Sequence, residues 1–130
     1  MKQEYYLPAV PSSAPAARAL VREAAGTLGL DGRATWELML ATTEAVANAI
    51  EHGEPCRSVE EGIGLTLESS GDGLSVEVHD GGSFTFAPAP LEQLSTGGRG
   101  IPIIAAVVDQ LEVHPIDGTR VRFTKRLQAA

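Results

Sequence analysis

Hydrophobic residues along the chain follow two spacings that predict different elements. Three stretches place them three or four residues apart, as on one face of a helix: residues 13–28, 33–52 and 101–111. Five stretches alternate hydrophobic with polar residues, which is typical of half-buried strands: residues 2–10, 63–67, 74–78, 111–116 and 119–127. We expect the first strand at a sheet edge, because Pro8 lacks an amide donor.

Capping residues mark the ends of the first two predicted helices. Ser12 or Ser13 can cap the first helix, and Gly29 ends it. Asp31 offers a cap for the second helix, which contains no glycine or proline until Gly53 stops it. The sequence therefore predicts two consecutive helices joined by a very short turn.

The order of the elements predicts the fold class. Asp-Gly turns at residues 71–73 and 117–118 join strands into two hairpins. Residues 81–98 are rich in Gly, Pro and Ser and follow no period, which is typical of a long functional loop such as a lid. We expect one domain over residues 1–130, of the α+β class: a two-layer sandwich with helices on one face of a mixed, mainly antiparallel sheet.

Composition restricts the functions that such a domain can serve. The formal net charge is −7 at pH 7, which argues against nucleic acid as a partner because phosphate backbones are bound by Lys and Arg. The sequence has no apolar run of membrane-spanning length and no secretory signal, and its single Cys56 excludes an internal disulfide. We expect a cytoplasmic protein that binds neither nucleic acid nor membranes, and in which an anionic ligand needs a metal ion or free backbone amides.

The second predicted helix carries a narrow polar arc. Leu40 and Ala47 extend its apolar surface, so most of the helix is expected to be buried. The remaining arc of about 80° holds four polar residues and no Lys or Arg: Glu37, Glu44, Asn48 and His52. One interpretation is the solvent-facing stripe of a core helix. The other is a site in which Glu44 is a general base and Asn48 offers an oxygen to Mg²⁺. His52, near the helix end, is interpreted as structural.

Asp80 follows a predicted strand and is followed by two glycines. An ordinary turn after a strand explains this pattern. A functional interpretation is that the Asp80 carboxylate accepts a hydrogen bond from an exocyclic amine, while Gly82, without a Cβ, lets a flat base approach the backbone. An adenine ring requires both features.

A second glycine cluster opens the third predicted helix. Gly98 and Gly100 flank Arg99, and the free amides of a helix start favour a phosphate there. A flexible loop that leads into a helix is the alternative. The cluster is not a dinucleotide-binding fingerprint, because Ile103 occupies the place of the third glycine. Residues 81–98 contain no Lys or Arg, so we expect Mg²⁺ to balance most of the phosphate charge.

These features, in this order, resemble the four sequence boxes of the Bergerat-fold ATPases, the GHKL-type superfamily of histidine-kinase-like ATP-binding domains. The boxes correspond to residues 44–52, 80–82, 98–100 and 118–119. The resemblance implies that ATP and Mg²⁺ are the ligands, with Asn48 on the metal and Asp80 on the adenine amine. It also implies that residues 98–100 bind phosphates, that Thr119 supports Asp80 or a pocket water, and that residues 81–98 form the ATP lid.

Within this superfamily, the chain is most similar to the anti-sigma-factor serine/threonine kinases. This resemblance rests on the short chain and on the Glu-x-x-x-Asn-Ala-x-x-His form of the first box. It implies transfer of the γ-phosphate to a Ser or Thr of a STAS-type anti-anti-sigma factor, binding of a sigma factor, transcription regulation and a homodimer. Glu44 would take the hydroxyl proton. Phe84 follows Asp80 more closely than in the family, which bears on how the lid orders around ATP.

A silent regulator and a histidine kinase are alternatives to the serine/threonine kinase. A catalytically silent regulator would bind a protein partner when loaded with nucleotide and transfer nothing, but binding alone does not require a base such as Glu44. A histidine kinase would need a phospho-accepting histidine on a dimerisation helix, whereas His79 and His114 fall outside the predicted helices. We therefore expect a serine/threonine kinase, with the silent regulator as the alternative.

Overall fold

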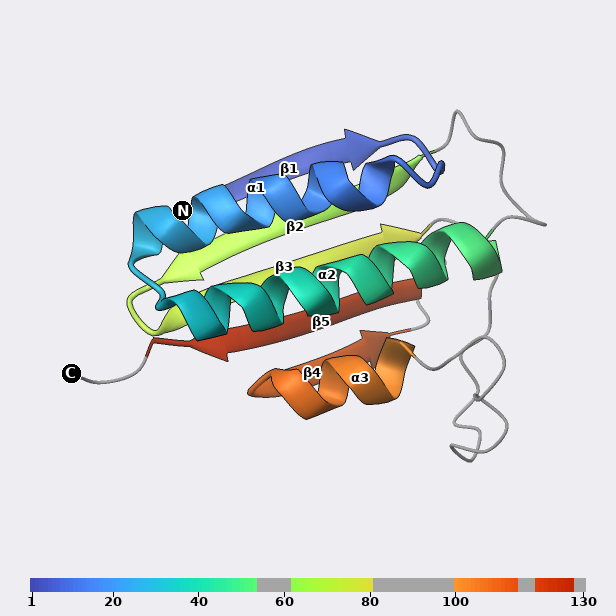
Figure 1. The fold of residues 1–130 in the computed structure, drawn as a ribbon. Coiled ribbons are helices and arrows are strands. Elements are labelled where there is room, and N and C mark those ends of the chain that lie inside the picture. Colours follow the sequence, from blue (N-terminus) through green and yellow to red (C-terminus); the bar gives the residue numbers. More distant parts are fainter. Residues whose placement is uncertain (54–61, 81–99, 115–118, 128–130) are drawn as a thin grey trace.

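The structure is a computed structural model that describes residues 1–53, 62–80, 100–114 and 119–127. Over these residues the chain forms three helices and five strands (Figure 1). The helices are α1 (Ser13–Leu28), α2 (Gly32–Gly53) and α3 (Gly100–Val107). The strands are β1 (Lys2–Leu7), β2 (Ile63–Ser70), β3 (Gly73–Asp80), β4 (Gln110–His114) and β5 (Thr119–Arg126). Among these helices, none is both long and apolar enough to cross a membrane.

The strands form one sheet in the order β1-β2-β3-β5-β4. Each neighbouring pair is antiparallel, so the described strands contain no parallel pair, where the sequence predicted a mixed, mainly antiparallel sheet. The chain leaves β3, forms α3 and β4, and returns through β5 into the place beside β3. α1, α2 and α3 lie side by side on one face of the sheet (Figure 1). The predicted α+β sandwich is confirmed.

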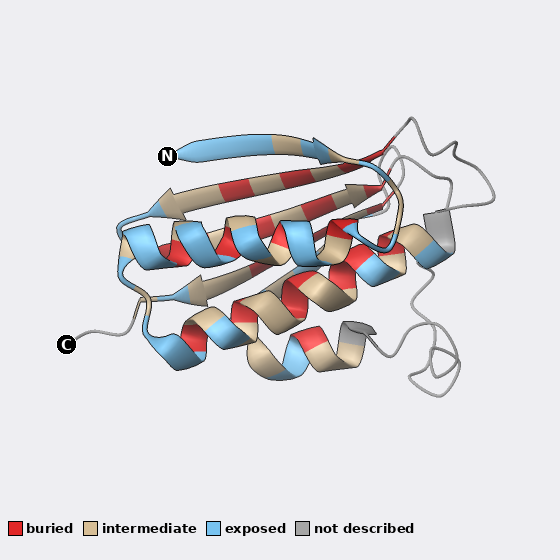
Figure 2. Cartoon of the chain, turned by 45° about the horizontal axis from the view of Figure 1, so that its top comes forward, coloured by how far each residue is buried: buried red, intermediate tan, exposed pale blue. Residues whose placement is uncertain are grey.

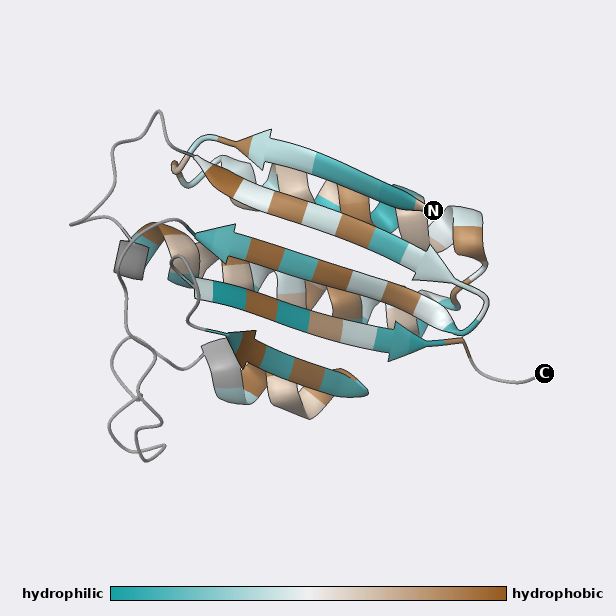
Figure 3. Cartoon of the chain, turned by 180° about the vertical axis from the view of Figure 1, so that it is seen from behind, coloured by the Kyte–Doolittle hydropathy of each residue, from teal (hydrophilic) through white to brown (hydrophobic). Residues whose placement is uncertain are grey.

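The core lies between this sheet and the helices. Alternate strand residues are buried toward the helices, which gives the red bands along the strands in Figure 2, and Figure 3 shows hydrophobic and hydrophilic residues alternating along the strands. The buried strand residues are Ile63, Leu65, Leu67, Leu74, Val76, Val78, Val121 and Phe123. The helices contribute Val21, Leu38, Val46 and Ile104, among others. Burial of each such side chain stabilises the fold by roughly 1.5–3 kcal/mol.

The first strand is shorter than the residues 2–10 that the alternating pattern predicts. β1 ends at Leu7, because Pro8 follows and cannot extend the ladder of hydrogen bonds. The Ser13 hydroxyl donates a hydrogen bond to the Pro8 carbonyl, so this serine ties the helix start to the end of β1. α1 ends as predicted at Gly29, whose φ of 92° is left-handed.

The helices α2 and α3 differ in how well their ends were predicted. The Asp31 carboxylate accepts a hydrogen bond from the Ala34 amide, with 2.7 Å between Oδ1 and N, and thus caps α2 as expected. α3 ends at Val107, earlier than predicted, because β4 already begins at Gln110. The Lys125 ammonium of β5 donates to the Val107 carbonyl at 3.0 Å. A distant strand therefore satisfies the carbonyl at this helix end.

Candidate functional site

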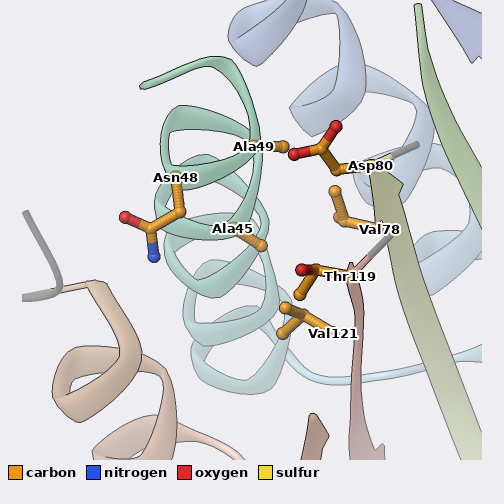
Figure 4. Close-up of a pocket in the computed structure, with 7 residues that line it drawn as sticks. All are labelled: Ala45, Asn48, Ala49, Val78, Asp80, Thr119 and Val121. Carbon is orange, nitrogen blue, oxygen red and sulfur yellow. The ribbon is translucent and has the colours of Figure 1, made fainter. Parts of the chain in front are cut away.

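Three residues from separate sequence motifs line one pocket between α2 and the sheet (Figure 4). They are Asn48, Asp80 and Thr119. The rest of the described lining is small and apolar: Ala45, Ala49, Val78 and Val121. The free space among these side chains is about 10 Å³, which is room for roughly one water molecule. These residues therefore form the wall of a site and not an enclosure for a whole base.

Strand pairing brings Asp80 and Thr119 together. Asp80 ends β3, Thr119 begins β5, and the two are direct partners in the antiparallel register. Both are buried, and Figure 4 shows them on the side of the sheet that faces α2. Val78 and Val121 form the next pair on the same face. A carboxylate and a hydroxyl beside an apolar wall suit a flat ring with a hydrogen-bonding edge.

Two alanines of α2 form the opposite wall. Ala45 and Ala49 are buried and lie one helical turn apart, so both point at the sheet. These alanines, and also Val78 and Val121, were not predicted as site residues from the sequence. The spacing of the valines could have identified them, because each stands two residues from Asp80 or Thr119 on the same strand, and such residues share a side of the sheet.

Asn48 points away from the two strand residues. In Figure 4 its amide extends toward the side of α2 on which α3 lies. Its Nδ2 atom is buried and finds no hydrogen-bond partner among the described residues. A native buried amide without a partner is uncommon and calls for an explanation. Because the nitrogen and oxygen of an Asn amide are assigned from their hydrogen bonds, a flipped amide places the oxygen at the same position.

This amide fits a metal that takes most of its ligands elsewhere. Among the described residues, no group of three or more His, Cys, Asp and Glu side chains can hold a metal ion. Mg²⁺ in nucleotide sites is typically bound by one or two protein oxygens, with phosphate oxygens and waters as the other ligands. One buried asparagine oxygen is compatible with that pattern.

The polar arc of α2 divides into a structural part and a candidate catalytic part. A Glu37 carboxylate oxygen lies 3.0 Å from Lys125 Nζ, and this ammonium also contacts α3 at the Val107 carbonyl. Glu37 therefore ties α2 to β5 and α3. Glu44 is half-buried and lies one turn before Asn48, on the same side of α2. The side chain of His52 lies outside the described residues.

The solvent-facing side of α2 carries Leu40 and Ala47, between the exposed Arg33 and Glu51, which corrects the expectation that these two apolar residues are buried. Ala47 is exposed, Leu40 is half-buried, and Trp36 is 61% exposed. Met39 and Ile50 pack against the core on one flank of α2, and Glu37 contacts α3 and β5 through Lys125 on the other flank. The helical period alone gives the angle of each residue but not the neighbours that cover it.

Some predicted site residues cannot be placed. Gly82, Gly98 and Arg99 lie outside the described residues, as does the lid expected over residues 81–98. Gly100 is the first residue of α3, so a helix begins at the glycine cluster as expected. The structure thus brings together one residue from each of three boxes, and Gly100, the described residue of the remaining box, begins the helix that packs against α2.

Comparisons with known proteins cover this whole region. Residues 7–125 match the sequence profile of the "Histidine kinase-like ATPase domain" family. A curated relative, the serine-protein kinase RsbW of Bacillus pumilus, is 28% identical over an alignment of 137 positions. The alignment covers 95% of this chain and 85% of the relative. The crystal structure of the RsbU and RsbW domains of Rv1364c from Mycobacterium tuberculosis is similar with a TM-score of 0.78 at 24% identity, over 100% of this chain and 33% of that longer chain. At 24% identity, this structural similarity shows the fold alone.

Proposed function

Because the chain belongs to the family of histidine kinase-like ATPase domains, we propose that it is an ATP- and Mg²⁺-dependent serine/threonine protein kinase. Its substrate is a STAS-type anti-anti-sigma factor, and it also binds a sigma factor, so that it regulates transcription by partner switching in the bacterial cytoplasm. The relative named serine-protein kinase RsbW supports this proposal. A homodimer is part of the same proposal.

The observation that carries the proposal is the pocket shared by Asn48, Asp80 and Thr119. The first is on α2 and the others on β3 and β5, yet all line one space. The Asp80 carboxylate accepts a hydrogen bond from the adenine amine, and the Thr119 hydroxyl orients that carboxylate or a water beside it. The apolar wall receives the ring, and Gly82 lets the base approach the backbone. Because the free space of this pocket holds only about one water molecule, the adenine ring lies at the opening of the pocket.

The phosphate side of the site lies between Asn48 and the start of α3. The Asn48 amide oxygen would be the protein ligand for the magnesium ion. A bound phosphate would supply the partner that the buried amide lacks among the described residues. Gly98, Arg99 and Gly100 bind the phosphates through backbone amides at the helix start and one guanidinium. When bound, Mg²⁺ offsets negative charge on the transferring group.

Glu44 is the proposed general base. It lies four residues before Asn48, hence about 6 Å along the helix axis, and it is half-buried, so a hydroxyl on another protein can reach it. Its carboxylate takes the proton of the Ser or Thr hydroxyl. The hydroxyl oxygen bonds to the γ-phosphorus as the bond from that phosphorus to the bridging oxygen breaks, and ADP leaves.

The test is transfer of label from Mg-ATP labelled on the γ-phosphate to candidate STAS-domain proteins. Wild type is expected to label one Ser or Thr of one partner. Glu44→Ala should lower transfer by at least about 100-fold while ATP binding is kept. Glu51→Ala is the matched control, because it removes an exposed carboxylate from the same helix and should leave transfer unchanged.

Thermal unfolding separates the kinase from its alternatives. ATP at about 100 times its Kd should stabilise the protein by about 2.7 kcal/mol when Mg²⁺ is present, and Asn48→Ala should remove most of the Mg²⁺-dependent part. Stabilisation without transfer to any partner would favour a catalytically silent, nucleotide-dependent regulator. If Mg-ATP gave no stabilisation at all, nucleotide binding itself would be the wrong proposal.

A further inference from the structure

The outer side of α2 carries apolar residues beside Glu44, between the exposed charged residues Arg33 and Glu51. Trp36, Leu40 and Ala47 fall within about 40° of one another around the helix axis, and we call these three residues the α2 ridge. Trp36 is 61% exposed, Ala47 is exposed and Leu40 is half-buried. Figure 2 shows α1, α2 and α3 side by side, with exposed bands along the outer side of the helices. The ridge therefore faces solvent.

The exposed indole of Trp36 is the unusual feature of this outer face. Outer faces are usually polar, and an indole can bury about 150–250 Å² when it is covered. Tryptophan is also among the residues most enriched in the energetic centres of protein interfaces. α3, which packs against α2, has no charged residue in its sequence GIPIIAAV and exposes Ala105 and Ala106. The helix that packs against α2 thus also exposes apolar residues.

We propose that the α2 ridge is the docking surface for the protein that receives the phosphoryl group. This inference rests on the proposed kinase function and specifies where its substrate binds. Trp36 lies eight residues before Glu44, or about 12 Å along the helix. A typical interface covers about 800 Å² on each partner, a patch roughly 30 Å across. A patch of that size centred on Glu44 includes Trp36.

The ridge defines the chemistry of the partner surface. The acceptor protein carries an apolar side chain about 12 Å from its reactive hydroxyl, so that this side chain packs on the Trp36 indole and on Leu40. Arg33 is exposed and lies one turn before Trp36. An acidic residue on the acceptor, at the end of the footprint farthest from Glu44, complements that guanidinium.

The single tryptophan of the chain reports on this surface directly. The acceptor used is the STAS-domain protein that receives label in the transfer assay, or its tryptophan-free variant. Its addition is expected to shift the Trp36 emission to shorter wavelength, because docking removes the indole from water. Trp36→Ala should raise the KM for the acceptor at least 10-fold and leave kcat and the stabilisation by Mg-ATP unchanged. Trp36→Phe should recover most of the loss.

Tyr6→Ala is the matched control, since Tyr6 is a large exposed residue on β1 and its loss should not change the KM for the acceptor. An unchanged KM in Trp36→Ala, with no emission shift in wild type, would overturn the ridge while the kinase stands. No transfer by wild type would overturn the kinase and, with it, the acceptor as occupant. A concentration-dependent emission shift of the chain alone, with doubling of its mass, would assign the ridge to a second copy instead.

Discussion

At one end of the sandwich, where α2 begins, charged groups hold the helices to the sheet through direct contacts. At the other end, where α2 stops, polar groups line a pocket. We call these the opposite end and the site end. At the opposite end, Lys125 Nζ lies 3.0 Å from a Glu37 carboxylate oxygen, and the Arg126 amide donates to the Asp109 carboxylate at 2.6 Å. The site end is marked by the pocket residues Asn48, Asp80 and Thr119.

The two ends differ in what their polar groups do for the fold. Hydrogen bonds completed inside the protein contribute to folding, while a buried donor without a partner destabilises it. Asn48 Nδ2 is such a donor among the described residues. A protein keeps such a group where a ligand provides the missing partner. Loss of the Lys125 side chain and loss of the Asn48 amide should therefore change stability with opposite signs.

The largest effect is expected from Lys125→Ala. The Lys125 and Glu37 side chains are only 16% and 15% exposed, so the variant leaves a nearly buried carboxylate without its cation and frees the Val107 carbonyl. The free energy of unfolding should fall by about 3 kcal/mol, measured by urea denaturation. Mg-ATP should still stabilise the folded variant.

A double variant checks the cause of this loss. Glu37→Leu combined with Lys125→Met replaces both charges with apolar groups, and should recover most of the stability that Lys125→Ala loses. If the double variant is as unstable as the single one, the ion pair is not what holds this end together. If either variant loses its response to Mg-ATP while folded, the two ends are not independent.

Gly73→Ala should have the next largest effect, at the opposite end. A Cβ at Gly73 would clash with the Lys125 carbonyl and would lie 2.8 Å from the Arg126 Cα, so the strands β3 and β5 would have to separate. We expect a loss of about 2 kcal/mol. Gly71→Ala, in the same hairpin, is the control, because its Cβ would meet no described atom within 4 Å; its stability should change by less than about 0.5 kcal/mol. Equal losses would contradict the close approach.

Asn48→Ala should have the opposite sign at the site end. The variant removes a buried amide donor that lacks a partner among the described residues, and alanine favours a helix more than asparagine does. Without nucleotide, the variant should be more stable by about 1 kcal/mol, although it loses Mg²⁺-dependent stabilisation by ATP. A destabilised variant that still responds fully to Mg-ATP would show that Asn48 is structural.

The sequence predicted most of the fold because the relevant signals are local. Hydrophobic spacing identified all the described helices and strands, and Asp31 and Gly29 marked helix ends through contacts within a few residues. The end of α3 was missed because Lys125, a residue of β5, satisfies the Val107 carbonyl. No local pattern encodes a contact between elements that far apart.

The residues alone predicted the candidate site as a list, and only the family resemblance implied that Thr119 supports Asp80 or a pocket water. Asp80 and Thr119 were each named from a short motif, but their pairing depends on β5 returning between β3 and β4. The polar arc of α2 was identified from helical spacing alone, whereas in the structure Glu37 pairs with Lys125 of β5 and so has a structural role apart from Glu44 and Asn48. Periodicity fixes which residues share a side of a helix, and tertiary packing decides what that side faces.

The smallest effect concerns an ion pair on the open face of the sheet, which sharpens the contrast with Lys125. Arg122 and Glu68 are 32% and 42% exposed, with 2.8 Å between Nη2 and Oε1. The hydrogen bond from Arg122, and then its charge, lower the pKa of Glu68 from the ordinary value of 4.5. A carboxylate whose pKa is lowered by folding stabilises the protein above its unfolded pKa, and this contribution is lost as the pH falls through the folded pKa.

Arg122→Gln should therefore return the pKa of Glu68 toward 4.5, which an NMR titration of that carboxyl group can follow. The stability difference between wild type and variant should be small at neutral pH, because water screens an exposed pair, and it should disappear as the pH falls through the lowered pKa of Glu68, where this carboxylate becomes protonated. The Lys125 variant should be far less stable than this one at neutral pH. Equal losses from the two ion pairs would mean that burial is not what distinguishes the opposite end of the sandwich from its open face.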